Sequence, residues 1–176
     1  SEARTEAEEL TAEAEDAEET LEAKRERLEE IDDRIETLEE TLEDAPVESD
    51  RLETHRASVR AELDDANERL AELRTELKNA RESVTEAERL LEAGKCPECE
   101  QPTEGSPHVE TLEDDRDRVS ELEAEIETQQ GKIEELETDH EQAVEFVETA
   151  TELSRLTENR EDVRSLIDQR TEAIED

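Results

Sequence analysis

Apolar residues recur along the first half of the chain at alternating steps of three and four positions, with charged residues between them. The first run is Ala7, Leu10, Ala14, Ala17, Leu21, Leu28, Ile31, Ile35, Leu38, Leu42 and Ala45, with Lys24 as its one polar member. A second run in the same frame is Val59, Leu63, Ala66, Leu70, Leu73, Leu77, Ala80, Val84, Ala87 and Leu91. A stripe this narrow is typical of the a and d positions of a coiled coil, because a helix of a globular bundle needs a wider apolar face.

The second half of the chain repeats this pattern less regularly. Its apolar positions are Val109, Leu112, Val119, Leu122, Ile126, Ile133, Leu136, Ala143, Val147, Ala150, Leu153, Leu156, Val163, Ile167 and Ile174. Gln129 and His140 fall on seam positions, and Gly131 weakens the helix between them. Three successive steps of three between Val147 and Leu156 indicate a local break in heptad phase.

Two stretches interrupt the helical pattern. Pro46 breaks the first run, although Ala45 and Leu52 lie seven residues apart and keep the same d position. The second stretch, residues 94–108, holds both cysteines and three of the four prolines, so a helix cannot cross it. Gly94 is placed to end the helix before it, and Ser106 with Pro107 is placed to start the next one.

These features predict an all-α fold, a long antiparallel coiled-coil hairpin. We expect an outgoing arm over residues 1–93 with a break near Pro46, a turn over residues 94–108, and a returning arm over residues 109–176. If paired residue numbers sum to about 202 throughout, Pro46 lies opposite residue 156 and residues before about 26 have no partner in the chain. The alternative is a three-helix bundle in which residues 1–44 fold back at Pro46.

Composition excludes several classes of protein. Acidic residues outnumber basic ones 60 to 21, the net charge is −39, and Phe146 is the one aromatic residue. Such a chain lacks the aromatic area of a compact core, and it repels nucleic acid and anionic membranes. The 17 Arg and 4 Lys, against so many carboxylates, indicate a salt-rich, halophilic cytoplasm. No apolar run predicts a membrane span or signal peptide, so we expect a cytoplasmic location.

The chemistry of the chain is concentrated in the central turn. Cys96 and Cys99 form a Cys-x-x-Cys pair with Pro97 between them, a spacing that lets both sulfurs reach one zinc ion. Structural zinc needs four ligands, and the chain has two cysteines. A second copy could supply the other two thiolates across a two-fold axis. This shared site, one zinc ion held by Cys96 and Cys99 of each of two chains, is the favoured interpretation.

Two other interpretations of the turn stay open. His108 or a carboxylate of the turn could complete a site within one chain; the carboxylates concerned are Glu98, Glu100 and Glu104. The pair could also be a redox dithiol, although no strand pattern indicates the βαβ setting that such a motif accompanies. His55 and His140 belong to the arms and are expected to be seam or flank residues.

The turn and its flanks carry a family resemblance. The apex reads Lys95-Cys96-Pro97-Glu98-Cys99-Glu100-Gln101-Pro102 and continues through Gly105-Ser106-Pro107-His108-Val109 between two heptad arms. It resembles the zinc hook and flanking coiled coil of the Rad-fifty DNA double-strand-break repair ATPases, which are SMC-like, ABC-type proteins, and in particular a haloarchaeal member. Glu100 departs from the pattern, because glycine often follows the second cysteine of such knuckles. Either crowding of the turn or the added negative charge near the metal is expected to lower zinc affinity.

The resemblance implies a tether. In the family, ATP-binding heads at the far ends of the arms bind DNA and a break-processing nuclease, and the hook joins two such assemblies. The chain begins in mid-pattern, so we expect it to be a piece of a longer protein. Its three glycines cannot form a phosphate-binding loop, so we expect no enzymatic activity from this segment. The alternative function is a purely structural coiled coil that dimerises along its arms and in which the dithiol is incidental.

Overall fold

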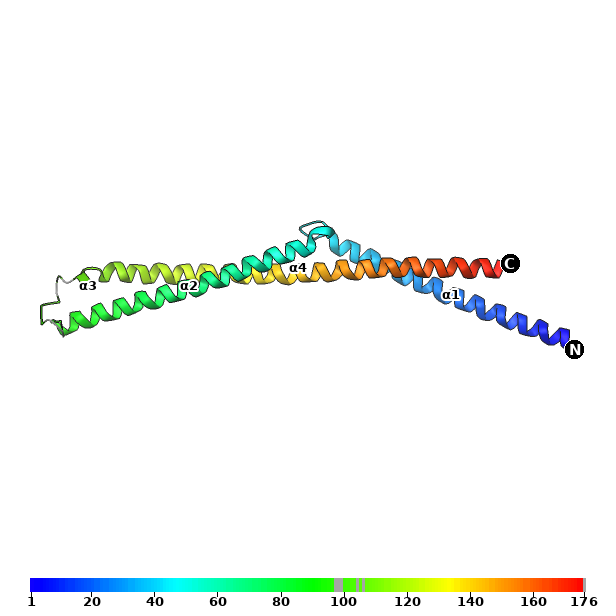
Figure 1. The fold of residues 1–176 in the computed structure, drawn as a ribbon, viewed down its shortest axis with the longest axis horizontal. Coiled ribbons are helices and arrows are strands. Elements are labelled where there is room, and N and C mark those ends of the chain that lie inside the picture. The colour runs from blue at the N-terminus through cyan, green and yellow to red at the C-terminus, as the bar shows by residue number, and fades with distance from the viewer. Residues whose placement is uncertain (97–99, 104, 106, 176) are drawn as a thin grey trace. The chain divides into compact units, whose positions relative to one another are not determined.

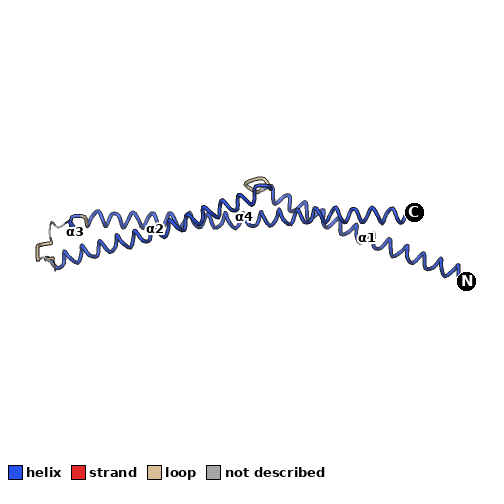
Figure 2. The backbone as a smooth tube through the Cα atoms, in the orientation of Figure 1, coloured by secondary structure: helices blue, strands red, loops and turns tan. Residues whose placement is uncertain are grey.

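The computed structural model describes residues 1–96, 100–103, 105 and 107–175, with the backbone alone for Pro107 and His108. Its elements in order are α1 (Glu2–Glu43), the 3-10 helix η1 (Ser49–Arg51), α2 (Leu52–Ala93), α3 (Pro107–Glu110) and α4 (Leu112–Glu175) (Figure 1). Within the described residues every element is a helix and the connections are loops (Figure 2). The predicted all-α class is confirmed.

The chain divides into two compact units. Unit 1 comprises Ser1–His55 and Ala143–Asp176, and unit 2 comprises Arg56–Gln142. Both α2 and α4 contribute to each unit, because each helix continues past the division. The central turn belongs to unit 2.

The core of unit 2 joins α2 to α4 through the expected seam residues. One cluster contains Leu73, Leu77 and Leu122, with Ala80, Val119 and Ile126 packed against it. A second cluster contains Leu63, Ala66, Leu70, Ile133 and Leu136. Leu122 is fully buried, and burying a leucine side chain contributes about 2 kcal/mol to stability. The heptad positions therefore form the contact between these two helices.

Ion pairs beside this core show that α2 and α4 run in opposite directions. Arg116 on α4 bonds Glu88 on α2 at 3.0 Å. Further along α4, Arg118 contacts Glu76 at 2.9 Å and Glu125 contacts Arg69 at 3.8 Å. As residue numbers rise on α4 they fall on α2, so this part of the chain is antiparallel. All these side chains are substantially exposed, so each pair adds little to stability by itself.

Gln129 and Gly131, which were expected to weaken α4, lie inside a continuous helix. Gln129 is half-buried, and its side-chain Nε2 donates a hydrogen bond of 2.9 Å to the carbonyl oxygen of Ala66 on α2. Gly131 is helical and exposed. The hydrogen bond gives the polar seam position a partner across the interface, and packing on either side keeps the helix intact despite the glycine.

Unit 1 has a core of the same kind between α1 and α4. Ile31, Ile35, Leu38 and Leu156 form its buried cluster, with Leu153 and Val163 packed against it. Two ion pairs also join these helices: Arg34 bonds Glu152 at 3.1 Å, and Arg160 lies 3.7 Å from Asp32. These contacts also run antiparallel.

The pairing register differs between the two units. Cross-helix ion pairs in unit 2 have residue numbers that sum to about 199, whereas those in unit 1 sum to about 191, a difference of about one heptad. The prediction that Pro46 lies opposite residue 156 is therefore wrong, because Leu156 packs on Ile31, Ile35 and Leu38. Paired residue numbers do not keep one sum along the chain, because the segment between Glu43 and Leu52 adds about a heptad of residues to the N-terminal arm and none to α4.

The same shift in register changes where α1 becomes buried. Leu21 is buried at 7% exposure, although residues before about 26 were expected to have no partner. The residue at which pairing begins was therefore placed too late in the chain, by about the register difference between the units. Nearer the N-terminus, Leu10 is 66% exposed and Ala14 is exposed, so the seam of α1 is uncovered there.

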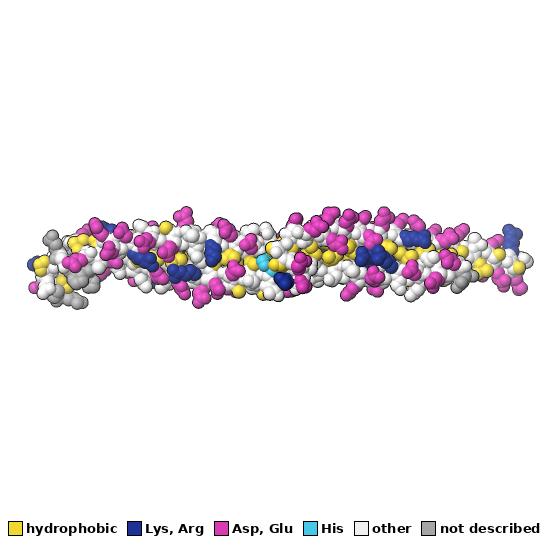
Figure 3. Space-filling model, turned by 90° about the horizontal axis from the view of Figure 1, so that it is seen from above, with side chains coloured by type: hydrophobic (Ala, Val, Ile, Leu, Met, Phe, Trp, Pro, Cys, Tyr) yellow, Lys and Arg dark blue, Asp and Glu magenta, His cyan; other side chains and the backbone are white. Residues whose placement is uncertain are grey.

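The outer faces of the helices are acidic. Figure 3 shows yellow hydrophobic side chains following a line along the visible face, with magenta carboxylates on both sides of it. Among the described residues no helix is long and apolar enough to span a membrane.

Candidate metal centre

The turn between α2 and α3 begins at Gly94, one residue past the end of α2. Gly94 has φ +69°, and its N–H donates to the carbonyl oxygen of Leu90 at 3.1 Å. This is the left-handed C′ position at which glycine ends a helix without steric cost, as the sequence predicted. At the far end of the turn, α3 begins at Pro107, again as predicted.

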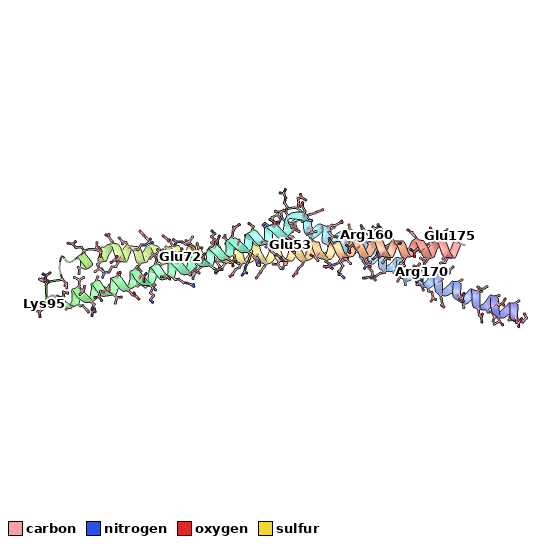
Figure 4. The ribbon with its side chains drawn as sticks, in the orientation of Figure 1. Glu53, Glu72, Lys95, Arg160, Arg170 and Glu175 are labelled. Atoms are coloured by element: carbon pink, nitrogen blue, oxygen red, sulfur yellow. The ribbon has the colours of Figure 1, made fainter. Side chains whose placement is uncertain are left out.

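A short antiparallel pairing closes the base of the turn. Lys95 and Pro102 form an isolated bridge, and the N–H of Thr103 donates to the carbonyl oxygen of Gly94 at 3.3 Å. The N–H of Cys96 donates to the carbonyl oxygen of Gln101 at 2.9 Å. These bonds align the two limbs of the turn, one leaving α2 and one leading towards α3. Figure 4 shows Lys95 just beyond the end of α2.

Above this pairing the chain reverses between Cys96 and Glu100. The N–H of Glu100 donates to the carbonyl oxygen of Cys96 at 2.9 Å, closing a five-residue turn. Cys96 thus opens the tight turn, and its side chain is half-buried. Of the two candidate thiolate ligands, the structure places Cys96 here, and a zinc site would need Cys99 as well. Zinc bound there would draw the two thiols into their deprotonated form.

Glu100 occupies an unusual backbone conformation. Its φ is +57°, the only positive value among the described non-glycine residues. For a residue with a Cβ this left-handed conformation costs about 1 kcal/mol or more. The backbone here adopts a conformation that glycine would take at no cost.

The predicted ligands are described in part. Cys96 lies at the start of the turn, whereas Cys99, Glu98 and Glu104 lie outside the described residues. The backbone of His108 is in α3, and nothing is described of its side chain. Glu100 is exposed. In the described part of the chain, no three His, Cys, Asp or Glu side chains come close enough together to hold a metal ion.

His55 and His140 belong to the helices and not to the turn. His55 is half-buried on α2 and His140 is half-buried on α4. This placement agrees with their interpretation as arm residues.

Sequence reasoning missed one residue of the turn. Thr103 is 3% exposed and is the one buried polar residue in the described part of the chain. Its N–H holds the carbonyl oxygen of Gly94, so it fixes the base of the turn against the end of α2. The available signal was weak: a β-branched residue following Pro102 favours an extended backbone, which the pairing with Gly94 requires.

Comparison with known proteins adds no identification. No family model, no curated protein and no solved structure matches the chain.

Proposed function

We propose that this chain is a zinc-dependent homodimerisation module, a hook in which Cys96 and Cys99 of two copies hold one zinc ion. The observation that supports this most directly is the turn itself. It links α2 to the returning helices, and two 2.9 Å backbone hydrogen bonds hold Cys96 in it, from Cys96 to Gln101 and from Glu100 to Cys96. Backbone hydrogen bonds that hold Cys96 in place reduce the cost of ordering its thiolate around a metal ion.

The proposal includes the finer architecture of an antiparallel coiled-coil hairpin with the hook at its apex. Among the described residues, one buried cluster joins α1 to α4 and two join α2 to α4, and none of these clusters joins α1 to α2. This supports two arms over a three-helix bundle, in which residues 1–44 would pack beside α2.

Metal binding and dimerisation are then one equilibrium. Each chain has half of the ligand set, so zinc favours the dimer and protons on the thiols oppose it. The two copies repel each other because each carries a charge of −39, and added salt screens that repulsion. Salt is therefore expected to tighten the dimer, the reverse of its effect on an interface held by surface ion pairs.

The biological role we propose follows the resemblance to the Rad-fifty repair ATPases. In this role the hook tethers two repair complexes in a halophilic cytoplasm, where reducing conditions keep the thiols available. DNA, the nuclease partner and ATP would bind to head domains outside this segment. The acidic helices themselves would contact neither nucleic acid nor membrane, and the segment would catalyse no reaction.

A second function is favoured by a separate observation in unit 1. Leu10 on α1 is 66% exposed and Ile174 on α4 is 43% exposed, so apolar seam positions are uncovered there. A structural coiled coil that dimerises along its arms would use such positions, and its cysteines would be incidental.

Zinc content and solution mass measured together test the two functions. With zinc present, we expect a dimer containing one zinc per two chains, and a chelator should return it to monomer. Cys96→Ser combined with Cys99→Ser should abolish both the zinc and the dimer. Leu10→Ser serves as the matched control, because it removes an uncovered apolar residue from the arm and should leave the zinc dimer intact.

The opposite pattern would overturn the hook. If the double cysteine variant still dimerises and Leu10→Ser does not, association runs along the arms. One zinc per chain in a monomer would instead indicate a mononuclear site completed within the chain.

A further inference from the structure

One face of α2 in unit 2 differs in charge from the rest of this acidic chain. A groove of about 570 Å³ lies along this face, and its first part is lined by Arg74, Lys78 and Arg81. Glu82 and Glu86 line its later part. Acidic residues outnumber basic ones 60 to 21 in the chain, so three basic residues beside one groove reverse the charge locally.

Arg74 is the residue of this groove whose charge the chain itself does not match. The cross-helix ion pairs on the same side of the seam are Arg81 with Glu123, at 2.9 Å, and Glu88 with Arg116, at 3.0 Å. The residue numbers of both pairs sum to 204, and the same sum places Gln130, an uncharged amide, opposite Arg74. In the part of the chain that the structure describes, Arg74 forms neither an ion pair nor a hydrogen bond.

We propose that this groove is an interface at which α2 of a second copy lies antiparallel to α2 of the first. The order of charges along the groove makes it self-complementary, because the basic residues come first and the acidic residues follow. Two antiparallel copies related by a two-fold axis beside Ala80 place Arg74 of each chain by Glu86 of the other, and Lys78 by Glu82. A parallel arrangement in the same register would bring like charges together instead.

The charges of the groove select a second copy over other partners. Its acidic part would repel a uniformly acidic partner, and its basic part would repel a uniformly basic one. Lys78 lies 4.0 Å from Glu82, and Glu86 bonds Arg89 at 2.8 Å, but these pairs are exposed and a carboxylate can accept further hydrogen bonds. From Arg74 to Glu86 the contact spans about 18 Å of helix, so we expect weak association.

This contact involves no zinc, so it is measured with a chelator present. Sedimentation equilibrium at about 0.5 M salt is suitable, because the Debye length of about 4 Å screens distant carboxylates more than charges in contact. Arg74→Glu and Glu86→Arg each place like charges at both ends of the contact, and each should weaken association about tenfold or more. Arg25→Glu is the matched control: Arg25 is exposed on α1, and this variant should stay within about twofold of the wild type.

Mixing the two single variants is the sharpest test. A chain with Arg74→Glu carries glutamate at both positions, and a chain with Glu86→Arg carries arginine at both. Each variant repels its own copies at this contact, whereas the two together are complementary at both ends. We expect the mixture to associate one to one, within about threefold of the wild-type affinity. Circular dichroism of each variant checks that the helices are retained.

Two results would overturn the inference directly: a wild type that stays monomeric up to about 1 mM, or a mixture that associates no better than either variant alone. Association that survives both charge reversals and is lost in Leu10→Ser would run along the uncovered seam of α1, which also overturns it. None of these results bears on the proposed zinc hook, because the chelator removes zinc from the measurement.

Discussion

Arg34 on α1 and Glu152 on α4 form a two-point ion pair in unit 1, with Nε donating to Oε1 and Nη2 donating to Oε2, each at 3.1 Å. Hydrogen bonding from Arg34 lowers the pKa of Glu152 below its ordinary value of 4.5 and outweighs desolvation, which raises the pKa; the positive charges of Arg34 and Arg155 add smaller lowering effects. This two-point geometry fixes α1 against α4 more specifically than a single contact would.

The lowered pKa gives the pair a defined pH dependence. A carboxylate whose pKa is lower in the folded state stabilises the fold above its unfolded pKa, and this contribution disappears as the pH falls through the folded value. We therefore expect Glu152→Gln to destabilise unit 1 at pH 7 and to have no effect once the pH is well below 4.5. Thermal unfolding in high salt, followed by circular dichroism from pH 7 downwards, measures the difference.

The control for this experiment is Glu148→Gln on the same helix. Glu148 is exposed, and its replacement by glutamine removes an equal charge from the same acidic surface. This variant therefore shows how much stability changes from reduced repulsion between carboxylates alone. Both side chains at position 152 and 148 lie on the surface, so the difference between the variants should be modest. A difference that stays constant with pH would show that the Arg34 pair does not carry it.

The hydrogen bond between Gln129 and Ala66 leads to a second prediction. A polar residue at a seam position usually costs stability and selects one register, because its partner is available in that register alone. We expect Gln129→Leu to raise the free energy of unfolding by about 1 kcal/mol, since the half-buried amide is replaced by an apolar side chain. Urea unfolding at fixed high salt measures this gain.

The cost of Gln129→Leu should appear as lost specificity of pairing. Hydrogen exchange should show weaker protection in unit 2 than the added stability would predict, because more than one register becomes populated. Gln130→Leu is the matched control: Gln130 is exposed, one residue from the seam, and its replacement should change neither quantity. Equal behaviour of the two variants would show that Gln129 has no special place in the interface.

Local chemistry made the ends of the helices predictable. Gly94 and Pro107 bound the turn as expected, because each has a backbone preference that does not depend on the rest of the fold. The seam was predictable as well, since the three–four spacing of Leu63, Ala66 and Leu70 dictates which face is buried. Neither inference requires knowing which residues pair across the helix interface.

The change in pairing register with α4, between α2 and α1 on the two sides of Pro46, was not predictable from local chemistry or spacing. A heptad pattern repeats every seven residues, so adding seven residues to one side leaves every apolar position in phase and changes every partner. Nothing in the spacing of Ala45 and Leu52 shows whether the chain between them is helical or looped out. At the turn, the sequence identified the cysteines as candidate ligands, but the left-handed Glu100 and the buried Thr103 depend on backbone pairing that has no periodic signal.

The register difference between the units leads to a third prediction, on a shortened chain. Deleting residues 45–51 would join Asp44 to Leu52 and remove seven residues, including Pro46. Leu52 would then take the seam position that Ala45 holds in the heptad frame. Because the deletion equals the register difference of about one heptad, the partners of α1 and of α2 on α4 should all stay the same. We expect helicity to be retained and the unfolding temperature to stay equal or rise.

Deleting only residues 46–51 provides the matched control for this chain. It also removes Pro46, but it leaves Leu52 one position away from the seam, so the apolar residues of α1 and α2 cannot both face α4 in one continuous helix. Circular dichroism in high salt should show a lower unfolding temperature for this variant than for the seven-residue deletion. If the two deletions unfold alike, the segment between Glu43 and Leu52 adjusts its length freely, and the heptad account of the register shift is wrong.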